Sequence, residues 1–259
     1  MNNKIYVYSG TGNCYALAKQ LSNEIEDTEV IHITDEIASP DTMINANRCI
    51  IVAPVYGYGL PATVLRFIKN ANFDVKYLAV LVTFGTKPKG AMAQAIRHFA
   101  KRGIQVDYTG GSKSVENYVH MFGWPSDEKI KQVTDKQREN TIALAKDIID
   151  RKTNTRMKFR PLSSLFSTIF TAASKVFARR YKFTPACNGC GICHKVCPAR
   201  AIEMTGEDTK KPVVNARKCD HCQACLQLCP KKAIKFGRIK PDGKRYKHTE
   251  VELKELIKR

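Results

Sequence analysis

The chain has 259 residues, 43% of them hydrophobic and 26% charged, which is enough for more than one domain with a buried core. This length argues against a small secreted protein held together by disulfides. No run of 18 uncharged apolar residues occurs, so we expect no transmembrane helix.

The formal net charge of +19 is distributed unevenly. Residues 1–150 carry 17 basic and 16 acidic side chains, residues 151–185 carry nine basic and none acidic, and residues 186–259 carry 17 basic and eight acidic. The three net charges are therefore +1, +9 and +9. Such an excess favours an acidic partner protein, a nucleic acid or an anionic membrane surface. We expect a domain over 1–152, a basic linker over 153–185, and a second domain over 186–259 with a basic C-terminal tail.

The first predicted strand, Ile5–Tyr8, leads into a turn of sequence S-G-T-G-N-C at Ser9–Cys14. A helix follows, because apolar residues recur at helical spacing from Leu17 to Ile25. A turn of this kind before a helix offers backbone N–H groups, hydroxyls and the helix dipole to an anion. It is neither a dinucleotide fingerprint, since Tyr15 replaces the third glycine, nor a P-loop. The sequence therefore predicts a phosphate site, with a glycine-rich turn that binds nothing as the alternative.

Strands then alternate with helices, as in a doubly wound α/β domain. The other predicted strands are Glu29–Ile33, Arg48–Ala53, Tyr77–Thr83 and Ile104–Tyr108, and the predicted helices are Ala62–Asn70, Gly90–Arg102 and Asp127–Arg151. Five strands in this rhythm fit a parallel sheet of order 2-1-3-4-5, whose switch point lies between strands one and three. The loops after strands one, three and four should then meet at one crevice.

These loops resemble the FMN-binding loops of flavodoxins. Ser9–Cys14 is similar to the family's phosphate loop S/T-x-T-G-N-T, with Cys14 in place of the usual threonine. Asn117 and Tyr118 match the end of the M-P-x-N-Y stretch of flavodoxin domains fused to ferredoxins, although the residues before them differ. The resemblance implies that FMN is bound by Ser9, Thr11, Gly12, Asn13, Cys14, Pro54, Val55, Tyr56, Gly57, Thr83, Phe84, Gly85, Asn117 and Tyr118.

The basic linker contains a predicted amphipathic helix. The apolar residues on one side of the predicted helix are Leu162, Leu165, Phe166, Ile169, Phe170, Ala173, Val176 and Phe177. Arg179 and Arg180 follow at the C-terminal end, where the helix dipole favours cations. We expect this helix to pack the two domains together. A weak contact of residues 162–180 with an anionic membrane surface is the alternative.

Eight of the ten cysteines lie in an internal repeat, Cys187–Ile202 and Cys219–Ile234, offset by 32 residues. Each copy reads C-x2-C-x2-C-x3-C-P, and seven of sixteen aligned residues are identical. The spacing is typical of thiolate ligands to a metal centre. Two structural zinc sites are the alternative, but the last part of the motif fits zinc poorly.

This repeat resembles the two-cluster bacterial ferredoxins, in which the fourth cysteine of each run binds the other cluster. The resemblance implies a small α+β domain with two [4Fe–4S] clusters. It assigns Cys187, Cys190, Cys193 and Cys229 to one cluster and Cys197, Cys219, Cys222 and Cys225 to the other.

Taken whole, the chain resembles fusions of a flavodoxin with a ferredoxin. The resemblance implies an electron-transfer protein that passes electrons between FMN and two clusters, and to or from an acidic redox partner. No catalytic residue is evident, and the alternative function is an FMN-dependent reductase of a small, quinone-like acceptor. Nucleic-acid binding ranks last, because no binding motif accompanies the charge. Cluster-type cysteines and the lack of a signal-peptide pattern favour the cytoplasm, and oxygen-sensitive clusters favour an anaerobe.

Overall fold

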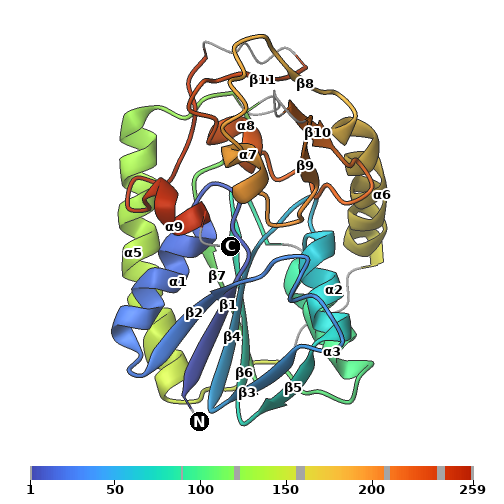
Figure 1. Ribbon diagram of the computed structural model, residues 1–259. Coiled ribbons are helices and arrows are strands. Elements are labelled where there is room, and N and C mark those ends of the chain that lie inside the picture. Colours follow the sequence, from blue (N-terminus) through green and yellow to red (C-terminus); the bar gives the residue numbers. More distant parts are fainter. Residues whose placement is uncertain are drawn as a thin grey trace.

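The computed structural model describes residues 2–88, 90–119, 123–155, 161–206, 211–237 and 243–257. An α/β domain lies below a smaller cysteine-rich domain in Figure 1, and helix α6 (Pro161–Ala178) runs along one side of both. The cysteine-rich domain therefore lies over one end of the sheet.

Five parallel strands form the central sheet: β1 (Asn3–Val7), β2 (Thr28–His32), β4 (Arg48–Pro54), β6 (Leu78–Phe84) and β7 (Tyr108–Lys113). Their order is β2-β1-β4-β6-β7, which is the predicted order 2-1-3-4-5 when only these strands are counted. This is the flavodoxin-like order of doubly wound folds. Two further strands that the sequence pattern did not indicate, β3 (Met43–Ala46) and β5 (Asn72–Val75), pair separately.

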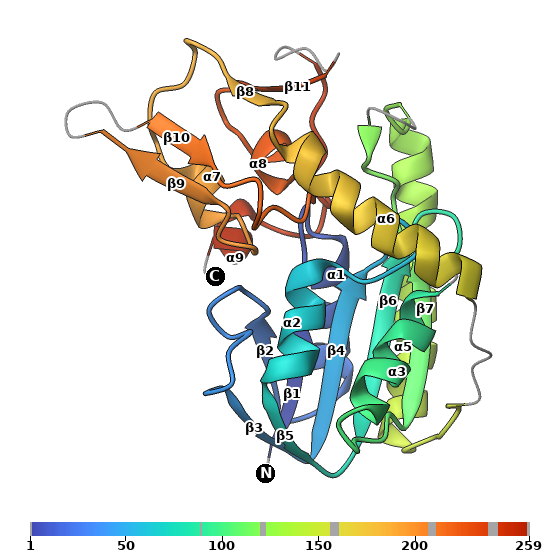
Figure 2. The ribbon, with the colours of Figure 1, turned by 90° about the vertical axis from the view of Figure 1, so that its right-hand side faces the viewer.

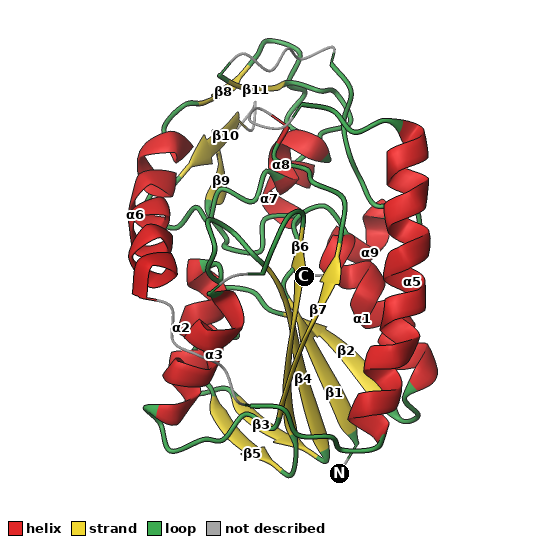
Figure 3. Ribbon diagram, turned by 180° about the vertical axis from the view of Figure 1, so that it is seen from behind, coloured by secondary structure: helices red, strands yellow, loops and turns green. Residues whose placement is uncertain are grey.

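Helices cover both faces of the sheet: α1 (Asn13–Glu24), α2 (Ala62–Asn70), α3 (Ala91–Ala100) and α5 (Asp127–Ile149). Successive strand residues point to opposite faces and so build two cores. Ile51 is buried on the face covered by α2 and α3, and its neighbour Ile50 is buried on the face covered by α1 and α5. Figure 3 shows these three layers from behind.

The fifth strand of the sheet begins later than predicted. The expected strand was Ile104–Tyr108, whereas β7 starts at Tyr108 and includes Gly110 and Gly111. Neighbouring side chains fill the space beside these glycines: a Cβ on Gly110 would lie 2.6 Å from a Leu144 side-chain carbon. Strand propensity alone misplaced this strand, because glycine is usually rare in strands.

The cysteine-rich domain is built from short elements: β8 (Tyr181–Phe183), α7 (Ile192–Lys195), β9 (Ile202–Thr205), β10 (Lys211–Val214), α8 (Ala224–Gln227) and β11 (Ile234–Phe236). Antiparallel pairs β8–β11 and β9–β10 enclose the two short helices. A last helix, α9 (Leu253–Ile257), returns to the α/β domain beside α1 (Figure 1). Among the described residues, no helix is long and apolar enough to cross a membrane.

Candidate functional site

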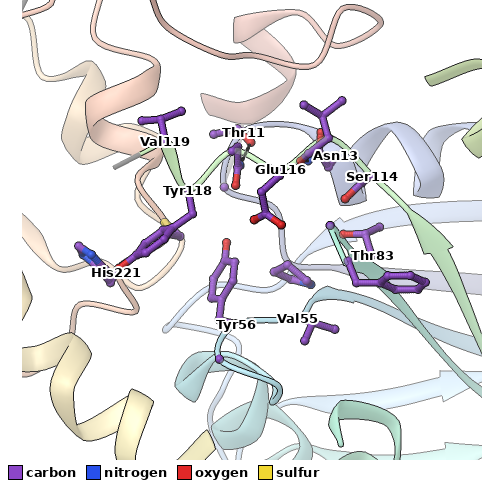
Figure 4. Close-up of a pocket in the computed structure, with 18 of the residues that line it drawn as sticks. Thr11, Asn13, Val55, Tyr56, Thr83, Ser114, Glu116, Tyr118, Val119 and His221 are labelled. Carbon is purple, nitrogen blue, oxygen red and sulfur yellow. Dashed lines mark hydrogen bonds between the residues drawn. The ribbon is translucent and has the colours of Figure 1, made fainter. Parts of the chain in front are cut away.

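A cavity of about 930 Å³ lies at the carboxyl edge of the sheet. The loops after β1, β4, β6 and β7 form one wall, and α6 with the cysteine-rich domain forms the other (Figure 4). In doubly wound domains this crevice is the usual place for a ligand. All residues predicted to bind FMN line it except Gly12: Ser9, Thr11, Asn13, Cys14, Pro54, Val55, Tyr56, Gly57, Thr83, Phe84, Gly85, Asn117 and Tyr118.

The loop between β1 and α1 is closed by its own hydrogen bonds and by one from the β7 loop. The Gly12 N–H donates to Ser9 Oγ at 3.2 Å, and the Asn117 side-chain amide donates to Thr11 Oγ1. Gly12 has a φ of 105°, a left-handed conformation that favours glycine. The first N–H groups of α1 have no carbonyl acceptor within the helix, so this turn can donate them to a phosphate.

Asn13 and Cys14, both predicted to contact the cofactor, tie this loop to its surroundings. The Asn13 amide donates to the Val115 carbonyl oxygen at 2.9 Å, and its side-chain oxygen accepts from the Tyr246 hydroxyl at 2.6 Å. The Cys14 sulfur lies 3.1 Å from Thr83 Oγ1. Both ends of the Asn13 side chain thus have partners within the fold, which leaves the backbone of the loop to bind an anion.

The loop after β4 turns sharply at the edge of the cavity. Tyr56 and Gly59 form an isolated antiparallel bridge, and Gly57 and Tyr58 between them have φ angles of 52° and 68°. This turn brings Val55 and Tyr56 to the cavity wall, where Figure 4 shows both side chains. An aromatic side chain at this place can pack against a planar ring system.

Glu116, which the sequence analysis did not assign to the site, projects its carboxyl group into the cavity (Figure 4). A Cβ on Gly85 would lie 1.8 Å from Glu116 Oε2, so this carboxyl group occupies the space that the glycine leaves. Burial raises the pKa of Glu116. The cavity therefore contains a carboxyl group that can hold a proton at a higher pH than an exposed glutamate does.

The second wall of the cavity was also missed by sequence reasoning. It comprises Phe166, Phe170 and Phe177 of α6, followed by Arg180, His221, Cys222 and Phe236. These residues lie in the linker and in the cysteine-rich domain, far along the chain from the first wall. The helical spacing of the three phenylalanines was the only available signal, and it did not indicate what they would face.

The structure brings several of the repeat cysteines close to one another. Cys187, Cys190, Cys193 and Cys229 line one small cavity. Burial raises the pKa of the Cys225 thiol, and the neighbouring Cys219, Cys222 and Cys197 raise it further. The division of the eight cysteines between two clusters stays a prediction from the resemblance to ferredoxins. Among the described residues, no group of three or more Cys, His, Asp or Glu side chains is arranged to hold a single metal ion.

Backbone N–H groups donate hydrogen bonds to cysteine sulfurs at equivalent positions in the two halves of the repeat. The Ala201 N–H donates to Cys197 Sγ and the Ala233 N–H to Cys229 Sγ, both at 3.3 Å. N–H groups that point at sulfur stabilise the thiolate form that binds iron. These two bonds are related by the 32-residue offset. The two halves of the repeat therefore surround Cys197 and Cys229 with equivalent backbone donors.

The cysteine-rich domain contacts the phosphate loop directly. A Cβ on Gly10 would lie 2.9 Å from the carbonyl oxygen of Cys222. Beside this contact, the buried Asp220 carboxylate accepts hydrogen bonds from the Tyr8 hydroxyl at 3.0 Å and from the Thr63 N–H at 3.2 Å. One cysteine loop is thus fixed against the α/β domain at the edge of the large cavity.

The C-terminal segment, residues 244–257, also packs on the phosphate loop. The His248 N–H donates to the Thr11 carbonyl oxygen at 2.9 Å, and a Cβ on Gly12 would lie 2.9 Å from His248 Cβ. Gly12 therefore faces this segment, which explains why it does not line the cavity. From its sequence pattern, this region is expected only to be a basic tail.

Comparison with known proteins identifies the second domain. Residues 186–233 match the family of 4Fe-4S dicluster domains. The chain joins a flavodoxin-like domain to a 4Fe-4S dicluster domain. The strand order of the sheet assigns the first part, and the family match assigns the second.

No sequence among the curated proteins matches the chain. Among solved structures, the chain is similar to the Trp repressor binding protein of Bacillus subtilis, with 15% identity over 58% of this chain and 99% of that chain and a TM-score of 0.37. It is also similar to two-electron reduced flavodoxin of Megasphaera elsdenii, with 16% identity, coverage of 56% and 98%, and a TM-score of 0.34. A flavoprotein of Lactobacillus acidophilus in complex with FMN shows 19% identity, coverage of 42% and 92%, and a TM-score of 0.32. Because these TM-scores are low, the flavodoxin-like fold of the first domain is assigned from the order of its strands.

Proposed function

We propose that the chain is an electron-transfer protein that uses FMN in the large cavity and two [4Fe–4S] clusters in the dicluster domain. One observation carries the proposal: Cys222, a predicted cluster ligand, lines the same cavity as the predicted FMN loops. Two redox groups held this close together can exchange electrons without diffusing to meet.

The cavity fits FMN in size and in chemistry. Its volume of about 930 Å³ lies within the usual range for cofactor sites. The N-terminus of α1 supports binding of a phosphate at one end, and Tyr56, Phe84 and Tyr118 support binding of a flat aromatic ring at the other. Gly10 and Gly12 both lie where a side chain would collide with a neighbouring segment, so the loop keeps a close-packed backbone.

When bound, FMN supplies one- and two-electron exchange, and each cluster supplies one-electron exchange. The protein contributes position and surroundings. Asp220 holds the Cys219–Cys222 loop against Tyr8 and Thr63, and α6 covers the cavity from outside. The buried Glu116 carboxyl group, with its raised pKa, is placed to take up or release a proton in the cavity.

The charge distribution supports an acidic redox protein as the partner. The linker and the dicluster domain each carry a net +9 when the cluster charge is left out. Oppositely charged surfaces accelerate association, and salt weakens that effect. We expect the rate of electron exchange with an acidic acceptor protein to fall as ionic strength rises.

Anaerobic reconstitution of the full chain tests the cofactor assignment. The expected content is about eight irons, about eight sulfides and about one FMN per chain, because two cubane clusters contain eight irons. A Cys222→Ser variant should lower the iron content and keep FMN, whereas the buried Cys49→Ser control outside the repeat should keep both. Zinc in place of iron, with no flavin retained, would refute the proposal.

A second candidate function is an FMN-dependent reductase of a small acceptor. The observation that favours it is the aromatic part of the cavity wall, formed by Phe166, Phe170 and Phe177 with Arg180 beside Phe177. These residues extend the cavity beyond the flavodoxin-like loops and suit a planar acceptor. Turnover of a quinone by the reconstituted chain, faster than by free FMN and slowed by Phe170→Ala, would establish this activity.

A further inference from the structure

Helix α6 exposes a row of large apolar side chains to solvent. The exposed fractions are 60% for Leu165, 58% for Ile169 and 56% for Val176. Phe166, at 48%, lies beside them. We call Leu165, Ile169 and Val176 the apolar stripe. Their spacing of four and seven residues places them along one side of the helix, and Figure 2 shows α6 crossing the front of the molecule.

The opposite side of α6 is the one that attaches the helix to the protein. Ser167 and Ser174 are buried there, and Phe170 packs on Gly57, where an added Cβ would lie 2.2 Å from Phe170 Cγ. At the other end, Phe177 contacts His221 of the dicluster domain, with ring centroids 6.0 Å apart. The helix therefore contacts both domains without using the apolar stripe. Domain packing does not explain these three residues.

Basic side chains accompany the stripe. Lys175 and Arg179 are exposed on the last turns of α6 and just beyond it. Residues 151–185 contain nine Lys and Arg and no Asp or Glu. An exposed apolar row bordered by cations, on a helix too short and too polar to cross a bilayer, is the pattern of helices that lie in the membrane interface.

This charge argues against one possible occupant of the stripe. A second copy of the chain would bring together two segments that each carry +9, and their repulsion opposes such a dimer. An anionic lipid surface instead offers negative headgroups to Lys175 and Arg179 and hydrocarbon to Leu165, Ile169 and Val176. We propose that α6 binds the chain to the surface of anionic membranes, with the apolar stripe inserted among the lipids. This inference does not depend on which cofactors the chain binds.

Vesicle flotation of the full chain tests the proposal. We expect binding to vesicles of phosphatidylcholine and phosphatidylglycerol, weaker binding in high salt, and little binding to phosphatidylcholine alone. The triple variant Leu165→Gln, Ile169→Gln, Val176→Gln should lose more than about tenfold in vesicle affinity, because it removes the side chains that enter the lipid. Replacing Lys175 and Arg179 by Gln should lower the affinity by about fivefold for each charge.

A matched control is available elsewhere on the surface. Met43, Ile142 and Val213 are 61%, 53% and 52% exposed, so the variant Met43→Gln, Ile142→Gln, Val213→Gln removes a similar exposed area. It should bind vesicles as the wild type does. Because all six positions are exposed, both variants should keep the circular dichroism and unfolding midpoint of the wild type. The proposal is overturned by equal loss in both variants, by binding that does not require anionic lipid, or by a stable dimer that the stripe variant dissociates.

Discussion

Equivalent positions of the two cysteine runs show that residues other than glycine can adopt a left-handed backbone conformation. Gly191 has a φ of 72°, and the residue 32 positions later, Gln223, has a φ of 62°. Likewise Gly189, at 72°, corresponds to His221, at 55°. The second run therefore adopts the same turn with ordinary residues, each at a cost of about 1 kcal/mol. Glycine is favoured at these positions by backbone conformation and is not strictly required.

This comparison predicts that Gly191→Ala is tolerated. A Cβ on Gly191 would meet no protein atom within 4 Å, so a conformational cost of about 1 kcal/mol is expected. Urea unfolding of the reconstituted protein should show that loss, with unchanged iron content. A large loss of iron in Gly191→Ala would contradict the prediction.

His248 makes the packing of the C-terminal segment sensitive to pH. Burial lowers the pKa of His248 from 6.5 to about 4, although Glu250 opposes the shift. The Glu250 N–H donates to His248 Nδ1 at 3.2 Å, which requires an unprotonated nitrogen there. Since the unfolded chain binds this proton more readily, the contribution to stability is complete above pH 6.5 and decreases as the pH falls toward 4.

We therefore predict that His248→Gln reduces the pH dependence of stability. Between about pH 7.5 and about pH 5.5 the wild type should lose about 1 kcal/mol of unfolding free energy through this group, and the variant should not. Urea unfolding at the two pH values measures the difference. If the variant keeps the whole wild-type dependence, other groups cause it.

At the scale of elements, α6 depends on two glycines of the β4 loop. A Cβ on Gly59 would lie 1.8 Å from Ser167 Oγ, and Gly57 makes the equivalent contact with Phe170. Both positions lack the side chain that would hold the helix away. The β4 loop and the linker helix are therefore shaped to each other.

Gly59→Ala should accordingly loosen α6. We expect trypsin to cut after Lys175 and Arg179 about tenfold faster than in the wild type, because a detached helix opens more often. Gly103→Ala is the control: it changes a glycine with a φ of 70° that has nothing within 4 Å of the added Cβ. Equal cleavage rates in the two variants would mean that Gly59 does not control the position of α6.

The sequence predicted the elements better than it predicted their contacts. Local patterns are sufficient for the order of the sheet and for the meeting of the three loops, because the carboxyl ends of parallel strands share one edge. The apolar spacing of α6 predicted a helix, but only part of the predicted apolar side faces the protein: Phe170 and Phe177 pack against it, whereas Leu165 and Ile169 are exposed. Apolar periodicity predicts that a helix has an apolar side, but the neighbouring parts of the fold determine which residues of that side are covered.

The second cavity wall was unpredictable for a related reason. His221 and Phe236 meet the flavodoxin-like loops only after the two domains pack, and no local pattern records that packing. The same holds for Tyr246, which reaches Asn13 across 233 positions of sequence. The spacing within a motif involves residues close together in the sequence, whereas the contact surface between two domains brings together residues that are far apart in it.

At the scale of the whole molecule, one apolar cluster joins three distant parts of the chain. It contains Ala16 of α1, Val196 and Leu228 of the dicluster domain, and Val251 and Leu256 of the C-terminal segment. Two surface ion pairs, Lys19–Glu255 and Arg138–Glu250, border it. The exposed pairs contribute little, so at this contact the buried cluster supplies most of the stabilisation.

Leu256→Ala tests this cluster. Leu256 is fully buried, so its truncation should lower the unfolding free energy by about 2–5 kcal/mol. It should also speed amide hydrogen exchange in α8, on the other side of the cluster. Leu21→Ala, which is equally buried but lies inside the flavodoxin-like domain alone, should destabilise the protein and leave exchange in α8 less affected. The reverse pattern would exclude a fastening role for the C-terminal segment.

The same cluster constrains the order in which parts of the chain can pack during synthesis. Ala16 and Leu256 are separated by 240 positions, so their contact cannot form until nearly all of the described chain has left the ribosome. The flavodoxin-like sheet, completed at Lys113, can form well before then. During this interval the face of α1 that will meet the other two segments remains uncovered. The nascent chain therefore passes through a stage in which the sheet is complete but the packing of the C-terminal segment on α1 and the cysteine repeat is not.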